Sequence, residues 1–280
     1  MKMNRIFLLL TSAILSAGVS ANVATPEQTL AEQRQQLAKN TQGKGFGPQS
    51  PRDVSDPAGH NTIVFNPAPP ASAMNLCNIH FHRNAEHVGG EFTTAATNAQ
   101  GEPAGFRYSG KLSSNELTPI KQAICPSEQG GLQSGDTIEV HYVYSSAKIS
   151  PGPTLEACFN DAIKNPQLRA EAQVYVLVND PAALDFGKLT QHGELNGVQQ
   201  AFNIPTNTGS AIEYAGSTTG PSYNEAGSPF QVTWRVNPKV AKVNIASVGK
   251  WCESNVFEED HAHGVRNLVV NPELLAPMTL

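Results

Sequence analysis

Two stretches of the chain alternate between polar and apolar residues with a period of two, which is the pattern of a half-buried β-strand. In residues 78–82 (Asn-Ile-His-Phe-His), Asn78, His80 and His82 share one face, and the apolar residues between them point the other way. Residues 136–144 alternate in the same manner and are rich in β-branched and aromatic side chains. The pattern predicts two strands, the first of which gathers two imidazoles on a single face.

The rest of the chain is predicted to form mainly short strands and loops. A helix is expected at residues 25–39, where Thr25 can cap the first turn, Pro26 fits the first helical position and Gln28 completes a capping box. A second, short helix is expected near residues 154–163. Further strands are expected at residues 61–66, 173–178, 230–236 and 240–248, and short strands with loops at residues 93–135 and 180–229. Because no internal repeat or long linker divides the chain, we expect one mainly β domain.

The first 21 residues have the composition of a removable secretory signal. Lys2 and Arg5 precede an apolar run at residues 6–14, and residues 19–21 (Val-Ser-Ala) fit a small-residue cleavage site. Three parts are therefore expected along the chain: a signal peptide at 1–21, an N-terminal helix and loop at 22–48, and the main domain at 49–280.

Charge and hydropathy restrict which partners and which cellular compartment are expected for the protein. The formal net charge is −5, and loss of Lys2 and Arg5 with the signal removes two positive charges, which gives −7. Basic residues are scattered rather than clustered, so nucleic acid is not an expected partner. No later stretch approaches about 18 consecutive apolar residues, so no membrane anchor is expected after processing. We expect a secreted or periplasmic protein, and the sequence leaves a homodimer open.

Four cysteines are present, and their number is even, as is common in exported proteins with disulfides. They are Cys77, Cys125, Cys158 and Cys252, for which three pairings exist. No Cys-x-x-Cys pair supports a thiolate metal site, and Cys77 lies on the strand face opposite the histidines.

The two histidines of the first strand are half of a candidate zinc site. Same-face neighbours on a strand lie roughly 6 to 7 Å apart, so both imidazoles can reach one ion. His141, in the second alternating stretch, is the best candidate for the third ligand. His87 is an alternative ligand, although a buried hydrogen-bonding role suits it better. Residues 258–263 (Glu-Glu-Asp-His-Ala-His) are interpreted as a solvated acidic loop.

With these residues placed, the sequence resembles a carbonic anhydrase of the delta class. The resemblance is carried first by residues 77–87, Cys-Asn-Ile-His-Phe-His followed by Arg-Asn-Ala-Glu-His. Several other segments resemble the alpha class and follow its order: 49–54 (Gln-Ser-Pro-Arg-Asp-Val), 139–141 (Glu-Val-His), 214–221, with its Ser-Thr-Thr, and 232–234 (Val-Thr-Trp). The resemblance implies a large twisted, mostly antiparallel sheet with a few short surface helices.

The resemblance also implies the chemistry. Zinc would be held by His80, His82 and His141, and zinc-bound hydroxide would attack carbon dioxide to give bicarbonate and a proton. Thr218 and Glu86 are the candidate catalytic pair, in which the threonine hydroxyl accepts from the hydroxide and donates to the carboxylate. Thr219 offers the same hydroxyl if the loop is shifted by one residue.

Other residues receive supporting roles. By strand parity, Asn78 could accept a hydrogen bond from His80, and Glu139 could accept one from His141. The dry side of the site, which would hold carbon dioxide, is expected to involve Val143, Val174, Val176 and Trp234, with Thr219 beside them. His60 resembles the alpha-class proton shuttle, and His192 is its rival.

Two other functions compete with this one. A cupin-type metalloenzyme would use His80, His82, Glu86 and His141, and that ligand set favours iron or manganese over zinc. A non-catalytic zinc-binding protein would keep the histidines without the activity.

Overall fold

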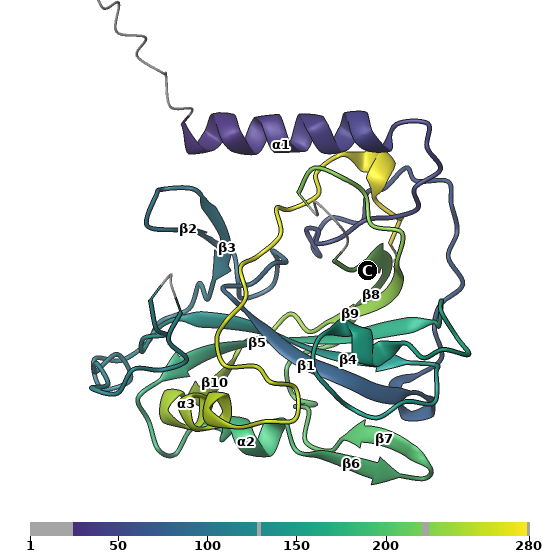
Figure 1. Ribbon diagram of the computed structural model, residues 1–280. Coiled ribbons are helices and arrows are strands. Elements are labelled where there is room, and N and C mark those ends of the chain that lie inside the picture. The colour runs from purple at the N-terminus through teal and green to yellow at the C-terminus, as the bar shows by residue number, and fades with distance from the viewer. Residues whose placement is uncertain (1–24, 128–129, 220–223, 279–280) are drawn as a thin grey trace, which may run out of the picture.

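A mixed β-sheet of six strands forms the centre of the computed structural model, which describes residues 25–127, 130–219 and 224–278 (Figure 1). Its strands are β1 (Asn75–Arg83), β4 (Thr137–Ser145), β5 (Leu168–Val178), β8 (Ile212–Ser217), β9 (Gln231–Val236) and β10 (Ala241–Asn244). Their order is β1-β4-β5-β9-β8, and β10 pairs with β5. The β1–β4, β4–β5 and β8–β9 pairs are antiparallel, whereas β9 and β10 each run parallel to β5. The predicted mainly β fold on one large sheet is confirmed, and the sheet is more mixed than expected.

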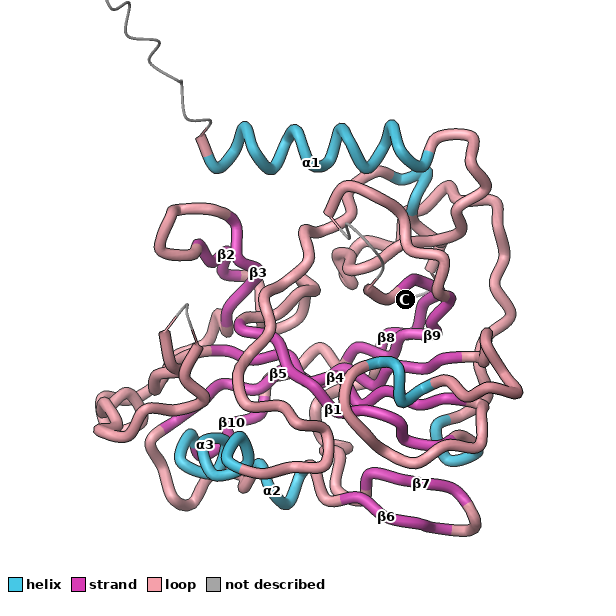
Figure 2. Tube along the Cα trace, in the orientation of Figure 1, coloured by secondary structure: helices cyan, strands magenta, loops and turns pink. Residues whose placement is uncertain are grey.

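Smaller elements surround the sheet (Figure 2). Two hairpins are formed by β2 (Thr94–Thr97) with β3 (Pro103–Arg107) and by β6 (His192–Leu195) with β7 (Val198–Ala201). The α-helices are α1 (Pro26–Thr41), α2 (Phe186–Leu189) and α3 (Ile245–Glu253), and the 3₁₀ helices are η1 (Ala71–Ala73), η2 (Leu155–Cys158) and η3 (Pro272–Leu274). None of the helices in the described part of the chain has the length and apolar character that crossing a membrane requires.

The N-terminal helix begins as the sequence predicts. The Thr25 side chain accepts from the Gln28 backbone N–H, and the Gln28 side chain accepts from the Thr25 backbone N–H. The helix continues to Thr41, two residues beyond the expected end. In Figure 1 it lies at the top of the molecule, on the opposite side of the sheet from α2 and α3.

Three other predicted elements differ in the structure. Residues 61–66 form no strand, because the Asn61 backbone N–H donates to Leu275 rather than to a strand of the sheet. The expected strand at 240–248 is β10 followed directly by α3, since the Asn244 side chain caps the helix by accepting from the Ala246 backbone N–H. Of the short helix expected near 154–163, only η2 forms.

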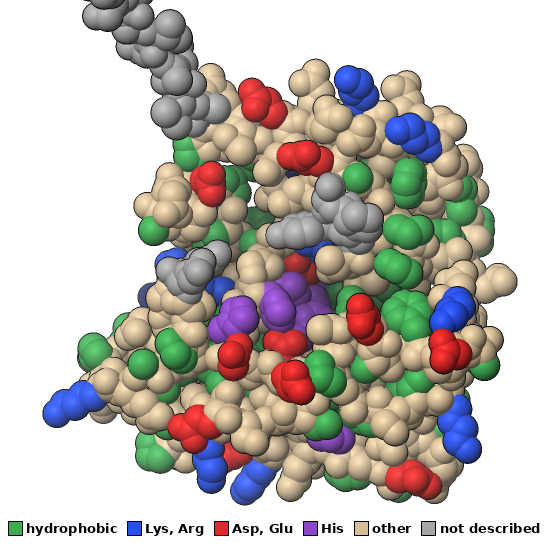
Figure 3. Space-filling view, viewed as in Figure 1, with side chains coloured by type: hydrophobic (Ala, Val, Ile, Leu, Met, Phe, Trp, Pro, Cys, Tyr) green, Lys and Arg blue, Asp and Glu red, His purple; other side chains and the backbone are tan. Residues whose placement is uncertain are grey.

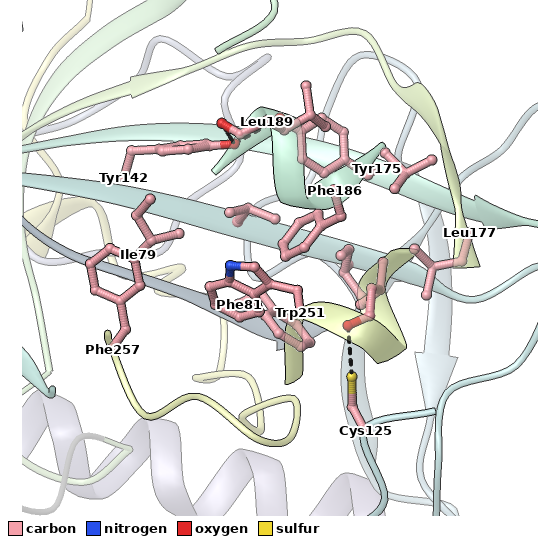
Figure 4. Packing of buried hydrophobic residues seen from close by; sticks show 14 of the residues in the cluster. Ile79, Phe81, Cys125, Tyr142, Tyr175, Leu177, Phe186, Leu189, Trp251 and Phe257 are labelled. Atoms are coloured by element: carbon pink, nitrogen blue, oxygen red, sulfur yellow. Dashed lines mark hydrogen bonds between the residues drawn. The ribbon is translucent and has the colours of Figure 1, made fainter. Parts of the chain in front are cut away.

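The two faces of the sheet bury different cores. One face packs against α2 and α3, where Phe81 of β1 makes ring contacts with Phe186 and Trp251 (Figure 4). The other face carries a second apolar cluster around Trp234, together with Cys77, Val143, Ala172 and Val174. The histidines of β1 and β4 lie on this second face, because side chains alternate along each strand. The expectation that Cys77 lies on the face opposite the histidines is wrong: a register shift between Leu76 and Asn78 interrupts the alternation, and Cys77 packs in the cluster on the histidine face.

Two disulfides join distant parts of the chain. Cys77 pairs with Cys158, which ties β1 to η2, and Cys125 pairs with Cys252, which ties a loop to α3. These are one of the three pairings that the sequence allowed. After α3 the chain returns along the outer edge of β1, and the yellow segment in Figure 1 shows this path up to the level of α1.

Candidate metal centre

Three imidazoles converge on the second face of the sheet. In the antiparallel register of β1 and β4, His80 stands directly opposite His141, and His82 is the next residue of β1 on that face. The Nε2 atom of His80 lies 3.2 Å from Nδ1 of His141. One nitrogen from each of the three rings lies within 4.8 Å of the others. Strand alternation and register therefore bring together the three histidines that the sequence proposed as ligands.

The second nitrogen of each ring faces a hydrogen-bond acceptor. Nδ1 of His80 lies 2.7 Å from Oδ1 of Asn78, and Nδ1 of His82 lies 2.9 Å from the carbonyl oxygen of Gly264. Nε2 of His141 lies 2.7 Å from Oε1 of Glu139. Each acceptor requires an N–H on the outer nitrogen, so the inner nitrogen keeps its lone pair for a metal.

Burial favours the neutral form of the two β1 rings, His80 and His82. It lowers the pKa of His82 to about 4 and holds the pKa of His80 well below its usual range. Neutral imidazoles are the form that binds a metal, because a protonated ring has no free lone pair. Three neutral nitrogen donors fit zinc in a site that keeps a further position for solvent.

Glu139 and His87 belong to one buried hydrogen-bond network. Oε2 of Glu139 accepts from the backbone N–H groups of Glu86 (2.8 Å) and His87 (3.1 Å). The His87 ring lies between Oε1 of Glu139 at 2.6 Å and the hydroxyl oxygen of Tyr214 at 2.7 Å. His87, Glu139 and His141 are also close enough to hold an ion, but both nitrogens of His87 already have partners. His87 is therefore a buried, hydrogen-bonding histidine, as the sequence analysis favoured, rather than a metal ligand.

A pocket of about 490 Å³ opens over His80 and His82. Figure 3 shows histidine side chains gathered in a hollow of the displayed face, with acidic side chains nearby. The pocket is lined by Asn78, His80, His82, Thr154, Leu155, Glu156, Thr219, Glu259, His263, Gly264 and Arg266. Thr154, Leu155 and Glu156 belong to the η2 region, which the Cys77–Cys158 disulfide holds against β1.

The threonine loop approaches the pocket through Thr219. Thr218 is half-buried and does not line the pocket, whereas Thr219 is exposed and does. In the described ranges, no hydrogen bond joins Thr218 to Glu86; the Glu86 carboxylate accepts from Arg266 instead. Residues 220 and 221, which continue the motif, lie outside the described residues. A cupin-type site would need Glu86 as a metal ligand, whereas here both oxygens of its carboxylate accept from Arg266.

The residues that were expected to line the carbon dioxide side of the site are part of the buried core. Val143, Val174, Val176 and Trp234 are all buried, and none of them lines the pocket. The ring centroid of Trp234 lies 4.9 Å from that of His141, so the indole packs edge-to-face against the imidazole. Half-buried Leu155 is the apolar residue that does line the pocket.

Neither expected proton shuttle lines the pocket. His60 is exposed and faces Glu273 at 3.5 Å, and the half-buried His192 packs against Phe257. The additional histidine at the pocket is His263, whose ring centroid lies 5.8 Å from that of His80.

Sequence reasoning placed His263 in a solvated loop and did not single out Arg266. That interpretation of residues 258–263 holds for Glu258, Asp260 and His261, which are exposed in a loop, but is wrong for Glu259, which is buried. Glu259 and His263 both line the pocket. No local signal marks these residues, because their segment has no regular secondary structure and meets β1 from about 180 residues further along the chain.

A mixed β-sheet with three histidines of this geometry defines the protein as one that can bind a metal ion. A family model described as "Delta carbonic anhydrase" matches residues 71–247. The chain belongs to the delta carbonic anhydrase family. The match covers the two strands that carry the histidines, and ends before the segment that contains Gly264 and Arg266.

Solved structures of alpha-carbonic anhydrases are also similar, at low identity. The enzyme of Thermovibrio ammonificans with sulfanilamide is 15% identical, over 87% of this chain and 92% of that one, with a TM-score of 0.27. The Photobacterium profundum enzyme is 16% identical over 88% and 95%, with a TM-score of 0.29. A halotolerant carbonic anhydrase from Dunaliella salina is 15% identical over 82% and 92%, with a TM-score of 0.29. No curated protein matches the chain.

Proposed function

We propose that this protein catalyses the reversible hydration of carbon dioxide to bicarbonate and a proton, with zinc held by His80, His82 and His141. The observation that carries the proposal is the convergence of three inner imidazole nitrogens while every outer nitrogen meets an acceptor. Membership of the delta carbonic anhydrase family supports the reaction.

The chain's own residues prepare the site for this chemistry. A zinc ion held by three histidines lowers the pKa of a bound water from 15.7 to about 7, an effect for which carbonic anhydrases are the standard example. Asn78, the Gly264 carbonyl and Glu139 fix the direction of the three rings, so the ligands need not reorient on binding. The pocket beside them admits a small molecule from solvent.

A threonine hydroxyl is proposed to orient the nucleophile. Thr218 remains the candidate from the resemblance, with Glu86 as the acceptor of its proton. Thr219 is the alternative, and its position at the pocket supports it. An ionised carboxylate accepts but does not donate, so it would direct the hydroxyl proton away from the metal.

We also propose that the protein works outside the cytoplasm. Two disulfides fit an oxidising compartment, either the periplasm or the exterior. The expected signal peptide at residues 1–21 lies outside the described residues, and N-terminal sequencing of the mature protein tests it.

Stopped-flow measurement of carbon dioxide hydration tests the activity. Wild-type protein loaded with zinc should exceed the buffer rate, a sulfonamide should inhibit it, and His80→Ala should lose both bound zinc and activity. His192→Ala is the matched control, because this half-buried histidine does not line the pocket. Zinc-loaded wild type that is no faster than buffer would leave a non-catalytic zinc-binding protein. Purified protein that contains iron or manganese instead of zinc would favour the cupin-type enzyme.

A further inference from the structure

The metal centre is completed by a segment from the far end of the chain. Residues 263–267, here called the edge segment, run along the free edge of β1. The backbone N–H of His263 donates to the carbonyl of Phe81 (2.9 Å), and the backbone N–H of Arg83 donates to the carbonyl of His263 (2.8 Å). These two bonds frame His82 and bring the Gly264 carbonyl against its Nδ1 atom.

Two residues further on, Arg266 binds Glu86 with both its backbone and its side chain. The backbone N–H donates to Oε1 of Glu86 at 2.7 Å, and Nη2 of the guanidinium donates to Oε2 at 3.3 Å. Both side chains are buried, with 6% and 1% of their surfaces exposed. The guanidinium also lies over the Trp234 ring, 5.9 Å from its centroid, so it is held from a second side.

Stability alone does not account for this ion pair. The cost of removing two charges from water can exceed what their attraction returns, and apolar replacements for such pairs are often neutral or stabilising. The pair has a specific location instead: Oε1 of Glu86 lies 3.6 Å from Nδ1 of His82, the same nitrogen that faces Gly264. A carboxylate next to the outer N–H of a ligand imidazole raises the basicity of that ligand.

We propose that Arg266 is a positioning residue of the metal centre, which holds the Glu86 carboxylate beside His82 and anchors the edge segment that supplies the Gly264 carbonyl. Through these contacts Arg266 sets the direction and the donor strength of the His82 ring without being a ligand of the metal. The inference rests on the proposed function for its activity readout, whereas its metal-affinity readout is independent of catalysis.

The test compares Arg266→Met, Arg266→Lys, Glu86→Gln and the double variant Arg266→Met/Glu86→Gln. Zinc affinity is measured by competition with a chelator, kcat and KM by stopped-flow hydration, and folding by circular dichroism. Arg266→Met should weaken zinc binding and lower kcat, each by roughly 10- to 100-fold as for other partners of metal ligands, with little change in KM. Arg266→Lys should recover part of both losses, because it keeps the charge.

The double variant shows whether Arg266 acts through Glu86. If it does, the double variant should bind zinc no more weakly than Glu86→Gln alone, since residues of one network are not additive. This variant also removes both buried charges, so it provides the comparison if Arg266→Met does not fold. Zinc binding by Arg266→Met as tight as that of the wild type would overturn the proposal, and so would a double variant whose loss is the product of the two single losses.

Arg169→Met is the matched control. Arg169 is also a buried arginine that binds a glutamate, Glu213 at 2.8 Å, but it does not line the pocket. Its loss should lower thermal stability and leave the zinc affinity of the folded protein unchanged. If wild type binds zinc tightly but does not hydrate carbon dioxide, the proposed activity fails, while the affinity series still decides the role of Arg266.

Discussion

Glu139 offers the sharpest single test of how the site is built. Its carboxylate accepts four hydrogen bonds, two from the backbone N–H groups of Glu86 and His87 and two from the rings of His87 and His141. All of these groups are buried. Glu139→Gln keeps the shape of the side chain but replaces one accepting oxygen by an NH₂ group, which can only donate.

The cost of this change follows from the hydrogen bonds it removes. Turned to the backbone, the NH₂ group faces the N–H groups of Glu86 and His87, which both lose their acceptor. Turned to the rings, it leaves His141 without an acceptor, whereas His87 can move its proton to the nitrogen that faces Tyr214. Each buried donor left unsatisfied costs about 1 to 3 kcal/mol, so we expect the free energy of unfolding of the metal-free protein to fall by about 1 to 6 kcal/mol. That is a large part of the 5 to 15 kcal/mol typical of a whole domain.

The assay is denaturant unfolding of Glu139→Gln with and without zinc. Zinc at about 1,000 times its dissociation constant adds about 4 kcal/mol to the stability of the wild type. The variant should gain less, because His141 has lost the acceptor that fixes its outer nitrogen, and zinc affinity should fall roughly 10- to 100-fold. Glu213→Gln is the control, since that side chain is 45% exposed and contacts arginines away from the pocket. A metal-free Glu139→Gln protein as stable as wild type would refute the reasoning.

Further changes test the threonine loop and the two disulfides. Thr218→Ala should lower hydration turnover and leave zinc content unchanged; if turnover stays at the wild-type value and falls only when the next residue is changed, the hydroxyl belongs to that residue. Serine replacements of Cys77 and Cys158, or of Cys125 and Cys252, open loops of 81 and 127 residues and should each cost about 4 to 5 kcal/mol in unfolding experiments. Only the first pair borders the pocket, so equal hydration rates for the two folded double variants would show that the η2 wall does not matter for activity.

The histidine centre was predictable because it depends on the alternation of side chains along strands. His80 and His82 are two residues apart on β1, and His141 lies on the neighbouring strand in a directly opposed register. Alternation also predicted which neighbours could orient the rings, since Asn78 and Glu139 stand two residues before their histidines on the same face. A period of two in the sequence is enough to derive these contacts.

The remaining parts of the site could not be derived in this way. Gly264 and Arg266 reach β1 and Glu86 through an irregular segment, where no periodicity indicates which way a side chain points. Residues 61–66 have the composition of a strand but lie beside the C-terminal segment without joining a sheet. Long-range contacts of this kind depend on the path of the whole chain, and local sequence patterns carry little information about that path.

Substitutions on the two faces of β1 should affect different properties: the core face should affect folding stability, and the histidine face should affect zinc binding. Phe81 is fully buried and packs against Phe186 and Trp251, with ring centroids 5.9 and 6.0 Å away, whereas His80 next to it points into the pocket. Phe81→Ala should therefore lower the free energy of unfolding by about 3 to 5 kcal/mol, because it leaves a cavity among these rings. The protein that remains folded should bind zinc with nearly wild-type affinity.

His80→Ala should give the opposite result. The ring is only half-buried and faces solvent through the pocket, so the metal-free protein should keep most of its stability while zinc binding is lost. Chemical denaturation without zinc and chelator competition with zinc measure the two quantities separately. If Phe81→Ala lost zinc affinity as severely as His80→Ala while still folded, the two faces would be mechanically coupled, and the alternation argument that places the centre would not be sufficient.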